Sequence, residues 1–178
     1  MRALIGLHNR VFLAISTMTA PWLLPTLARF TFAATLLVYF WHSANIKLDG
    51  GIFSLSFGAY AQVLPVKYEA LGYDPSLLSF FDKFIVYAGT YAEFLIPALI
   101  VIGLFTRLAA VGMIGFVAVL TYVDIFGHKA DAVTIGGWFD RVQDSQIMDQ
   151  RLFWFAILVT IIVKGAGPLS VDKFIGLK

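Results

Sequence analysis

Four long apolar runs separated by polar segments dominate the pattern of this chain. They occupy residues 27–43, 84–104, 108–125 and 151–164. Runs of this kind are typical of helices that cross a lipid bilayer, whose hydrocarbon core needs roughly 20 apolar residues to span. The fourth run is short, so it crosses the core only if the preceding residues extend its helix. The pattern predicts an all-α protein, a transmembrane four-helix bundle.

A different pattern precedes the first run. Between residues 1 and 25 the apolar residues recur on one helical stripe, which Arg2, His8 and Arg10 interrupt. Such a stripe is typical of a helix that lies in the plane of the membrane interface. Arg10 splits the apolar run and no small-residue cleavage site follows, so we expect an N-terminal interfacial amphipathic helix that is retained.

The segments between the runs predict how the helices connect. Only Thr106 and Arg107 form the turn between the second and third runs, so these two helices should form an antiparallel hairpin. Residues 44–83 carry glycines, prolines and mixed charges, which indicates an outside loop with a short amphipathic helix near residues 59–71. The polar residues 126–150 form the second outside loop.

Positive charges flank the runs unevenly. The flanks on one side contain a single acid, Asp172, and seven basic residues: Arg2, Arg10, Arg29, Arg107, Lys164, Lys173 and Lys178. The opposite loops contain a larger number of acids together with Lys47, Lys67, Lys83, Lys129, Arg141 and Arg151. Because the more positive flanks remain in the cytoplasm, we expect both termini there and the acidic loops outside.

The composition agrees with a membrane protein and excludes other classes. Of the 178 residues 60% are hydrophobic and 13% are charged, whereas soluble domains contain roughly 45–50% apolar residues. Four spans with their loops use the whole length, so residues 1–178 should form a single membrane domain. The net charge of +2, without a Lys/Arg cluster, argues against nucleic-acid binding. Cysteine is absent, which excludes disulfides and thiol chemistry.

Glu93 is the first candidate for function. It lies about three turns inside the second run, where an ionisable side chain costs roughly 2.5–3.5 kcal/mol, so it needs a partner or a proton. Thr90 and Pro97 share its helical face, which indicates a polar pocket at this depth. An interhelical hydrogen bond that only fixes the packing explains the same residues equally well.

A group of polar and aromatic residues is predicted near the outer ends of the runs. Its members are Tyr39, His42, Glu93 and Tyr122. A quinone headgroup could bind among them, because a ring needs flat apolar walls and a few hydrogen-bonding groups. Interfacial aromatic belts explain the tyrosines as well. Arg29, at the opposite end of the first run, is expected to hold the Thr106-Arg107 turn or a helix carboxyl end, a structural role.

His42, His128 and Asp124 are weak candidates for a metal site at the mouth of the bundle. Two histidines on separate segments, without a helical two-histidine motif, are usually solvated. We therefore predict no metal site. Haem is disfavoured too, because both histidines should lie at one membrane surface.

Two motifs give the chain a family resemblance. Ala92-Glu93-Phe94, followed by apolar residues and then by residues 103–110 (GLFTRLAA), resembles the signature of the DoxX family. Residues 27–43 are similar to the first helix of that family, and residues 165–172 (GAGPLSVD) to its carboxyl end. The sequence departs from the family at Ser43, where many relatives have glycine, and in the long polar loop before the fourth run.

The resemblance implies a multi-pass protein of the bacterial inner (plasma) membrane. The family is named for a small subunit linked to thiosulfate:quinone oxidoreductase and quinol oxidase, and other members are associated with redox-stress complexes. It therefore implies a redox-associated, quinone-linked subunit with a protein partner. Related four-helix quinone-reducing membrane proteins use cysteine pairs, and this mechanism does not transfer to a chain without cysteine.

Two alternative functions remain open. One is a non-catalytic membrane anchor that recruits a soluble partner through residues 44–83 and 126–150. The other is a proton or small-solute pathway through Glu93, which with four short helices would require a homo-oligomer. The chain has no phosphate loop, nucleophile elbow, zinc-binding helix motif or dinucleotide fingerprint, and hence no complete catalytic constellation of its own.

Overall fold

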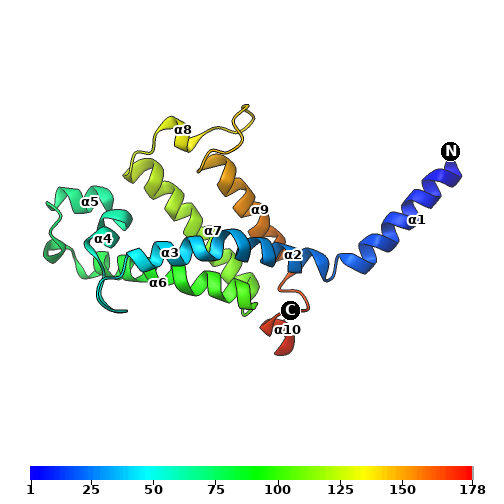
Figure 1. Ribbon diagram of the computed structural model, residues 1–178, viewed down its shortest axis with the longest axis horizontal. Helices are drawn as coiled ribbons and strands as arrows, with labels where there is room; N and C mark the ends of the chain where they lie inside the picture. The colour runs from blue at the N-terminus through cyan, green and yellow to red at the C-terminus, as the bar shows by residue number, and fades with distance from the viewer. Residues whose placement is uncertain (178) are drawn as a thin grey trace.

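The computed structural model describes residues 1–177, whose regular elements are helices (Figure 1). The α-helices are α1 Arg2–Thr19, α2 Leu23–Phe32, α3 Val38–Ile46, α4 Phe57–Val63, α5 Pro65–Ala70, α6 Phe80–Ile102, α7 Thr106–Tyr122, α8 Ala132–Ile135, α9 Met148–Lys164 and α10 Val171–Phe174. Shorter turns are the π-helical η1 Ala33–Leu37 and η3 Val123–Gly127 and the 3-10 turn η2 Pro75–Leu77. The turn η1 joins α2 to α3 in one continuous helix, and η3 prolongs α7.

Three helical stretches in the described part of the chain are long and apolar enough to cross a membrane. They are Leu23–Ile46, Phe80–Ile102 and Thr106–Gly127, and they overlap the first three predicted runs. The fourth run belongs to α9, which begins three residues earlier than predicted and has 17 residues. At 1.5 Å per residue α9 is about 26 Å long.

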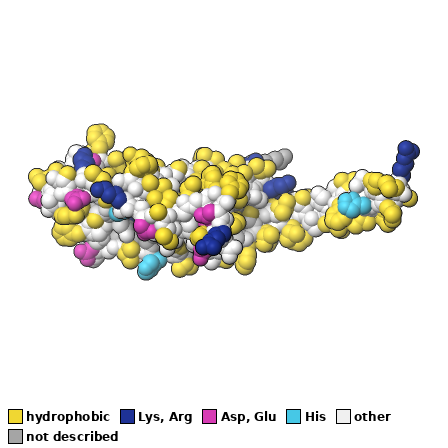
Figure 2. All heavy atoms as spheres, turned by 90° about the horizontal axis from the view of Figure 1, so that it is seen from above, with side chains coloured by type: hydrophobic (Ala, Val, Ile, Leu, Met, Phe, Trp, Pro, Cys, Tyr) yellow, Lys and Arg dark blue, Asp and Glu magenta, His cyan; other side chains and the backbone are white. Residues whose placement is uncertain are grey.

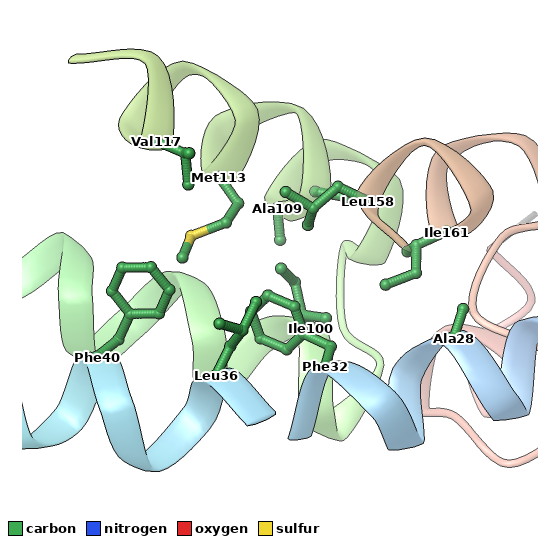
Figure 3. Close-up of a cluster of buried hydrophobic side chains, with 11 residues drawn as sticks. Ala28, Phe32, Leu36, Phe40, Ile100, Ala109, Met113, Val117, Leu158 and Ile161 are labelled. Atoms are coloured by element: carbon green, nitrogen blue, oxygen red, sulfur yellow. The ribbon is translucent and has the colours of Figure 1, made fainter. Parts of the chain in front are cut away.

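A single apolar core joins these helices (Figure 3). Figure 3 shows Phe32, Leu36 and Phe40 of the first long helix, Ile100 of α6, Met113 and Val117 of α7, and Leu158 and Ile161 of α9 converging on one another. Lipid tails are as apolar as these side chains, so close packing and dispersion, more than the exclusion of water, hold such helices together. The outer surface is apolar as well, as the spread of hydrophobic side chains in Figure 2 shows.

The N-terminal helix α1 extends away from the bundle (Figure 1), and none of its residues is buried. Its apolar side chains, Leu4, Leu7 and Phe12 among them, are therefore exposed. The helix ends at Thr19, and a short turn separates it from α2. Its location in the membrane interface stays a prediction.

The segment between α3 and α6 packs against the N-terminal half of α6. The single short helix predicted near residues 59–71 is divided into α4 and α5, because Pro65 starts a new helix after the non-helical Leu64. The hydroxyl of Tyr87 on α6 donates a hydrogen bond to the carbonyl of Phe53 (2.9 Å), which ties the loop to this helix.

Arg29 joins the C-terminal end of α6 to the segment that follows α9. Its Nε donates to the carbonyl oxygen of Ile100 (3.0 Å) and its Nη2 to that of Val101 (2.5 Å), in the last turn of α6. Its Nη1 donates to the carbonyls of Ala166 (2.8 Å) and Leu169 (2.5 Å) after α9. Carbonyls at a helix end have no partner within the helix. The prediction that Arg29 holds a helix carboxyl end is thus confirmed, and the contact also fixes the C-terminal segment.

Asp172 has the complementary role at the start of α7. Its carboxylate accepts hydrogen bonds from the backbone N–H groups of Phe105 (2.7 Å) and Thr106 (2.9 Å) and from the Thr106 hydroxyl (2.6 Å). These N–H groups have no partner within the helix. Burial alone would raise the pKa of Asp172, but the hydrogen bonds from Thr106 and Phe105, helped by the charge of Arg29, hold it below its usual value.

The turn between α6 and α7 requires glycine at its first position. Gly103 has a φ of 75°, and a Cβ atom there would lie 2.5 Å from Cβ of Ser170 and 2.9 Å from Nη2 of Arg29. The close approach of the C-terminal segment to the hairpin therefore depends on the missing side chain.

The capping role of Asp172 predicts a pH dependence of stability. Its carboxylate stabilises the fold at pH values above the unfolded-state pKa of about 4, and this contribution is lost as the pH falls through the lower folded-state pKa. Thermal unfolding in detergent between about pH 3 and pH 7 should show a steeper loss of stability for the native chain than for Asp172→Asn. The exposed Asp144→Asn is the control, and equal slopes for the native chain and Asp172→Asn would contradict the assignment.

Candidate functional site

The structure does not bring the candidate residues from the sequence together in one pocket. These residues were Glu93, Thr90, Tyr39, His42, Tyr122 and Arg29. Glu93 and Thr90 are buried on α6, and Thr90 donates its hydroxyl hydrogen bond to the carbonyl of Val86 within that helix. His42 and Tyr122 are exposed, whereas Tyr39 lines a groove described below.

Glu93 is paired with Lys47. The Lys47 Nζ lies 2.8 and 2.7 Å from the two carboxylate oxygens and donates a third hydrogen bond to Oγ of Ser43 (2.8 Å). The two charged side chains are only 4% and 5% exposed. The prediction that Glu93 needs a polar partner is confirmed. The placement of Lys47 in a solvent-facing loop is wrong, because α3 continues to Ile46 and directs the lysine onto α6.

A second charged pair joins α9 to the end of α7. Arg151, only 6% exposed, donates from Nη1 to the hydroxyl of Thr121 (2.6 Å) and from Nη2 to the carboxylate of Asp124. Its guanidinium lies 5.9 Å from the ring centroid of Trp154. Arg151 was counted among the loop charges at the boundary of the fourth run, but α9 begins at Met148 and Arg151 lies inside this helix.

Arg151 leaves one of its three guanidinium nitrogens without a partner in the described residues. Its Nε is buried and forms no hydrogen bond within the described part of the chain. A buried donor without an acceptor costs about 1–3 kcal/mol. Unsatisfied groups of this kind in a native protein call for an explanation, and a bound ligand is one.

Arg151 lies at the polar end of a groove of about 1210 Å³ between α2–α3 and α9. The apolar part is lined by Leu24, Leu27, Leu36, Phe153 and Ile157, and the polar part by Tyr39, Asp124, His128, Gln150, Arg151 and Trp154. Leu27 and Phe153 are more than half exposed, so the groove opens on the apolar surface of the bundle.

Both π-helical turns contribute to this groove. Thr35 and Leu36 come from η1, and Asp124 comes from η3. A π-helical turn inserts an extra residue into a helix and rotates the side chains that follow, and such turns are frequent at functional sites. Here they direct polar side chains of two long helices towards the same groove.

The groove is built for an amphipathic ligand. Its polar end combines hydrogen-bond donors with the rings of Tyr39 and Trp154, whose centroids are 5.5 Å apart. Its remaining walls are mostly apolar, with Thr31, Thr35 and Thr160 among the leucine, isoleucine and phenylalanine side chains. Small-molecule sites usually have this combination of mostly apolar walls and a few placed polar groups.

The weak metal candidates do not converge. His128 Nε2 lies 3.0 Å from the carbonyl oxygen of Gln62, Asp124 is paired with Arg151, and His42 is exposed. Among residues 1–177 no group of three or more His, Cys, Asp or Glu side chains lies close enough to hold a metal ion.

The fold and the groove define the class of this protein, an all-helical membrane-embedded protein. The family model for DoxX matches residues 24–128, more than half of the chain, and the chain belongs to the DoxX family. The matched region contains the three apolar helices, the Lys47–Glu93 pair and Asp124, whereas Arg151 and Asp172 lie beyond it. No curated protein and no solved structure matches the chain.

The sequence did not reveal Lys47 and Arg151 as buried cations. Each was counted among the charges of a loop because it lies at the boundary of an apolar run. The feature of the sequence that indicated their burial was an acid inside or at the end of another run. This acid is Glu93 for Lys47 and Asp124 for Arg151. A buried acid needs a cation, and the cations nearest to the run ends were the available partners.

Replacing one member of the buried Lys47–Glu93 pair should be far more harmful than replacing both. Lys47→Met or Glu93→Met alone should lower the free energy of unfolding by roughly 3–5 kcal/mol, because each leaves an unpaired buried charge. The double variant should recover most of this loss, since apolar residues can replace a buried pair at little cost. The free energies of unfolding of the native chain, the two single variants and the double variant, measured in detergent, give the coupling energy of the pair.

The matched control is Lys67→Met. Lys67 pairs with Asp82 at 2.7 Å, but its side chain is 54% exposed, so its loss should cost less than about 1 kcal/mol. Simple additivity of the two losses at Lys47 and Glu93 would show that the pair is not coupled.

Proposed function

We propose that this protein is a redox-associated, quinone-linked membrane subunit that binds a quinone in the groove between α2–α3 and α9. The observation that carries the proposal is the buried Arg151 in the polar lining of the groove, whose Nε has no hydrogen-bond partner among the described residues. A quinone carbonyl oxygen is an acceptor that would satisfy this donor, and its ring would lie against the aromatic side chains of Tyr39 and Trp154.

The dimensions of the groove support this choice of ligand. Pockets for drug-sized molecules have volumes of roughly 300–1,000 Å³, and the groove is somewhat larger, at about 1210 Å³. The additional length along Leu27 and Ile157 has room for an apolar tail that continues into lipid. A water-soluble substrate would find few polar groups there.

The residues of the polar end have distinct roles in this proposal. Arg151 donates a hydrogen bond to the ligand oxygen, and its charge stabilises negative charge that develops there. Tyr39 and Trp154 hold the ring. Asp124, whose side chain is 29% exposed, connects Arg151 to the surface of the protein. A bound quinone supplies the electron-carrying chemistry, for which a chain without cysteine has no group of its own.

In this proposal the chain is a four-span protein of the bacterial inner (plasma) membrane. The fourth span is α9, which packs on α2 and α7, and residues 1–178 form one domain with α1 in the interface. The cytoplasmic location of both termini is supported by Arg29, Arg107 and Lys164, which lie at the end of the bundle where α2 begins and α9 ends.

A second candidate function, a membrane anchor for a soluble protein, is favoured by the outside loops. Phe139 projects fully into the surroundings from a backbone with a φ of 64°, a conformation that bulky residues rarely adopt. Phe53 and Trp138 are also exposed on the outer segments. Exposed aromatic residues often become the anchor points of protein interfaces. A proton pathway gains no support, because Glu93 is committed to Lys47.

Quinone binding can be tested with decylubiquinone and purified protein in detergent. At a hundredfold excess over its Kd the ligand should raise the Tm by about 5–10 °C. Arg151→Lys keeps a cation beside Asp124 but has no Nε donor, so it should lose most of this rise. The exposed Arg141→Lys is the matched control. An unchanged Tm in the native chain, or an equal rise in Arg151→Lys, would refute the proposal.

The anchor function predicts a different result. A soluble protein that co-purifies with the native chain should be lost from Trp138→Ser/Phe139→Ser, because the substitutions remove the exposed aromatic contact. The thermal stability and the quinone response of this variant should be unchanged, since both residues lie away from the core. Retention of the partner by the variant would exclude this surface as its binding site.

A further inference from the structure

A second hollow lies at the end of the bundle opposite Arg151. It has a volume of about 570 Å³ and is formed by the turn before α2, the start of α7 and the segment that follows α9. Three cations from three helices line it: Arg107 in the first turn of α7, Lys164 in the last turn of α9, and Lys173 in α10. The groove of the proposed function shares none of these residues.

The charge of this hollow is not balanced within the described residues. None of the three cations has a carboxylate oxygen within 4.0 Å among residues 1–177. Asp172 is the acid of the lining, and its oxygens already accept hydrogen bonds from Phe105 and Thr106. The hollow therefore has positive charge to offer a ligand.

Arg107 is held in place beside the hollow. A Cβ atom on Gly165 would lie 3.2 Å from Nη2 and 3.3 Å from Nε of Arg107, so the guanidinium packs directly over this glycine at the end of α9. Gly165 is the residue after Lys164. The absent side chain at position 165 thus brings the two cations to the same side of the hollow.

The rim of the hollow is apolar. Leu108 is 72% exposed, Phe105 and Trp22 are about half exposed, and all three line the hollow together with Leu177. The indole nitrogen of Trp22 donates to the carbonyl of Met18, which leaves the ring available as an apolar wall. Tryptophan is typical of the headgroup level of a membrane, so the rim places the cations at the depth of lipid phosphates.

We propose that this hollow binds the phosphate group of an anionic phospholipid, with the acyl chains lying along Phe105 and Leu108. The three cations suit the phosphate, and the apolar rim suits the acyl chains at the depth of the headgroups. Basic pockets between membrane helices are known to bind lipid headgroups. The general enrichment of cations at one end explains Arg2 and Arg10, which lie dispersed on α1. It does not explain why three cations from three helices line one hollow. The inference is independent of quinone binding.

Delipidated full-length protein in neutral detergent tests this site. Phosphatidylglycerol should raise the Tm, whereas phosphatidylcholine at the same concentration and inorganic phosphate alone should have little effect. Each cation near the lipid surface is worth about 1 kcal/mol, or roughly a fivefold change in affinity. Lys164→Gln/Lys173→Gln should therefore weaken phosphatidylglycerol binding roughly twentyfold in a Tm titration. Arg107 is left unchanged because it packs on Gly165.

The matched control is Arg2→Gln/Arg10→Gln, which removes the same charge from α1 and should weaken binding less than about threefold. Equal losses in the two double variants would overturn the site in favour of general surface charge. Equal protection by phosphatidylcholine, or by phosphate alone, would overturn it as well. The comparison of lipids on the native chain needs no variant, so a failure of either variant to fold leaves the test intact.

Discussion

Water is absent from the hydrocarbon core of a membrane, so a polar group on a membrane helix must find its partner inside the protein. Three interactions answer this constraint here. Arg29 donates to four carbonyl oxygens, two in the last turn of α6 and two in the segment after α9. Lys47 pairs with Glu93, and Arg151 pairs with Asp124. Each joins different helices, and together with the apolar core they hold the bundle together.

The same constraint identifies the candidate site. All three guanidinium nitrogens of Arg29 donate to backbone carbonyls, which gives this residue a structural role. Arg151 is equally buried, but its Nε has no partner in the described part of the chain. It also lies at the end of a groove that opens on the apolar surface, whereas Arg29 closes the opposite end of the bundle. Both arginines lie near the start of an apolar run, but the tertiary structure leaves a guanidinium nitrogen without a hydrogen-bond partner in Arg151 alone of the two.

The two hollows of the molecule are complementary in character. The groove along α9 is long and mostly apolar with a polar end, which suits a ligand that enters from lipid. The hollow near α10 is short and lined by cations, which suits a phosphate at the membrane surface. Both lie beside α9, and the residues that distinguish them, Arg151, Lys164 and Lys173, all lie beyond the part of the chain that the DoxX model matches.

Most of the helical architecture could be predicted from the sequence because hydropathy and helix length are local properties. The three apolar helices, the short connection between the second and third runs and the need of Glu93 for a partner followed from residues close in the chain. The turn itself lies at residues 103–105, and the predicted turn residues Thr106 and Arg107 belong to the first turn of α7. The hydrogen-bond partners themselves did not follow from residues close in the chain. Lys47 and Glu93 are 46 residues apart and Asp172 and Thr106 are 66 apart, and such pairs depend on how helices pack and tilt. Hydropathy adds up along the chain, whereas burial of Arg151 and the groove beside it arise only when α9 lies against the other helices.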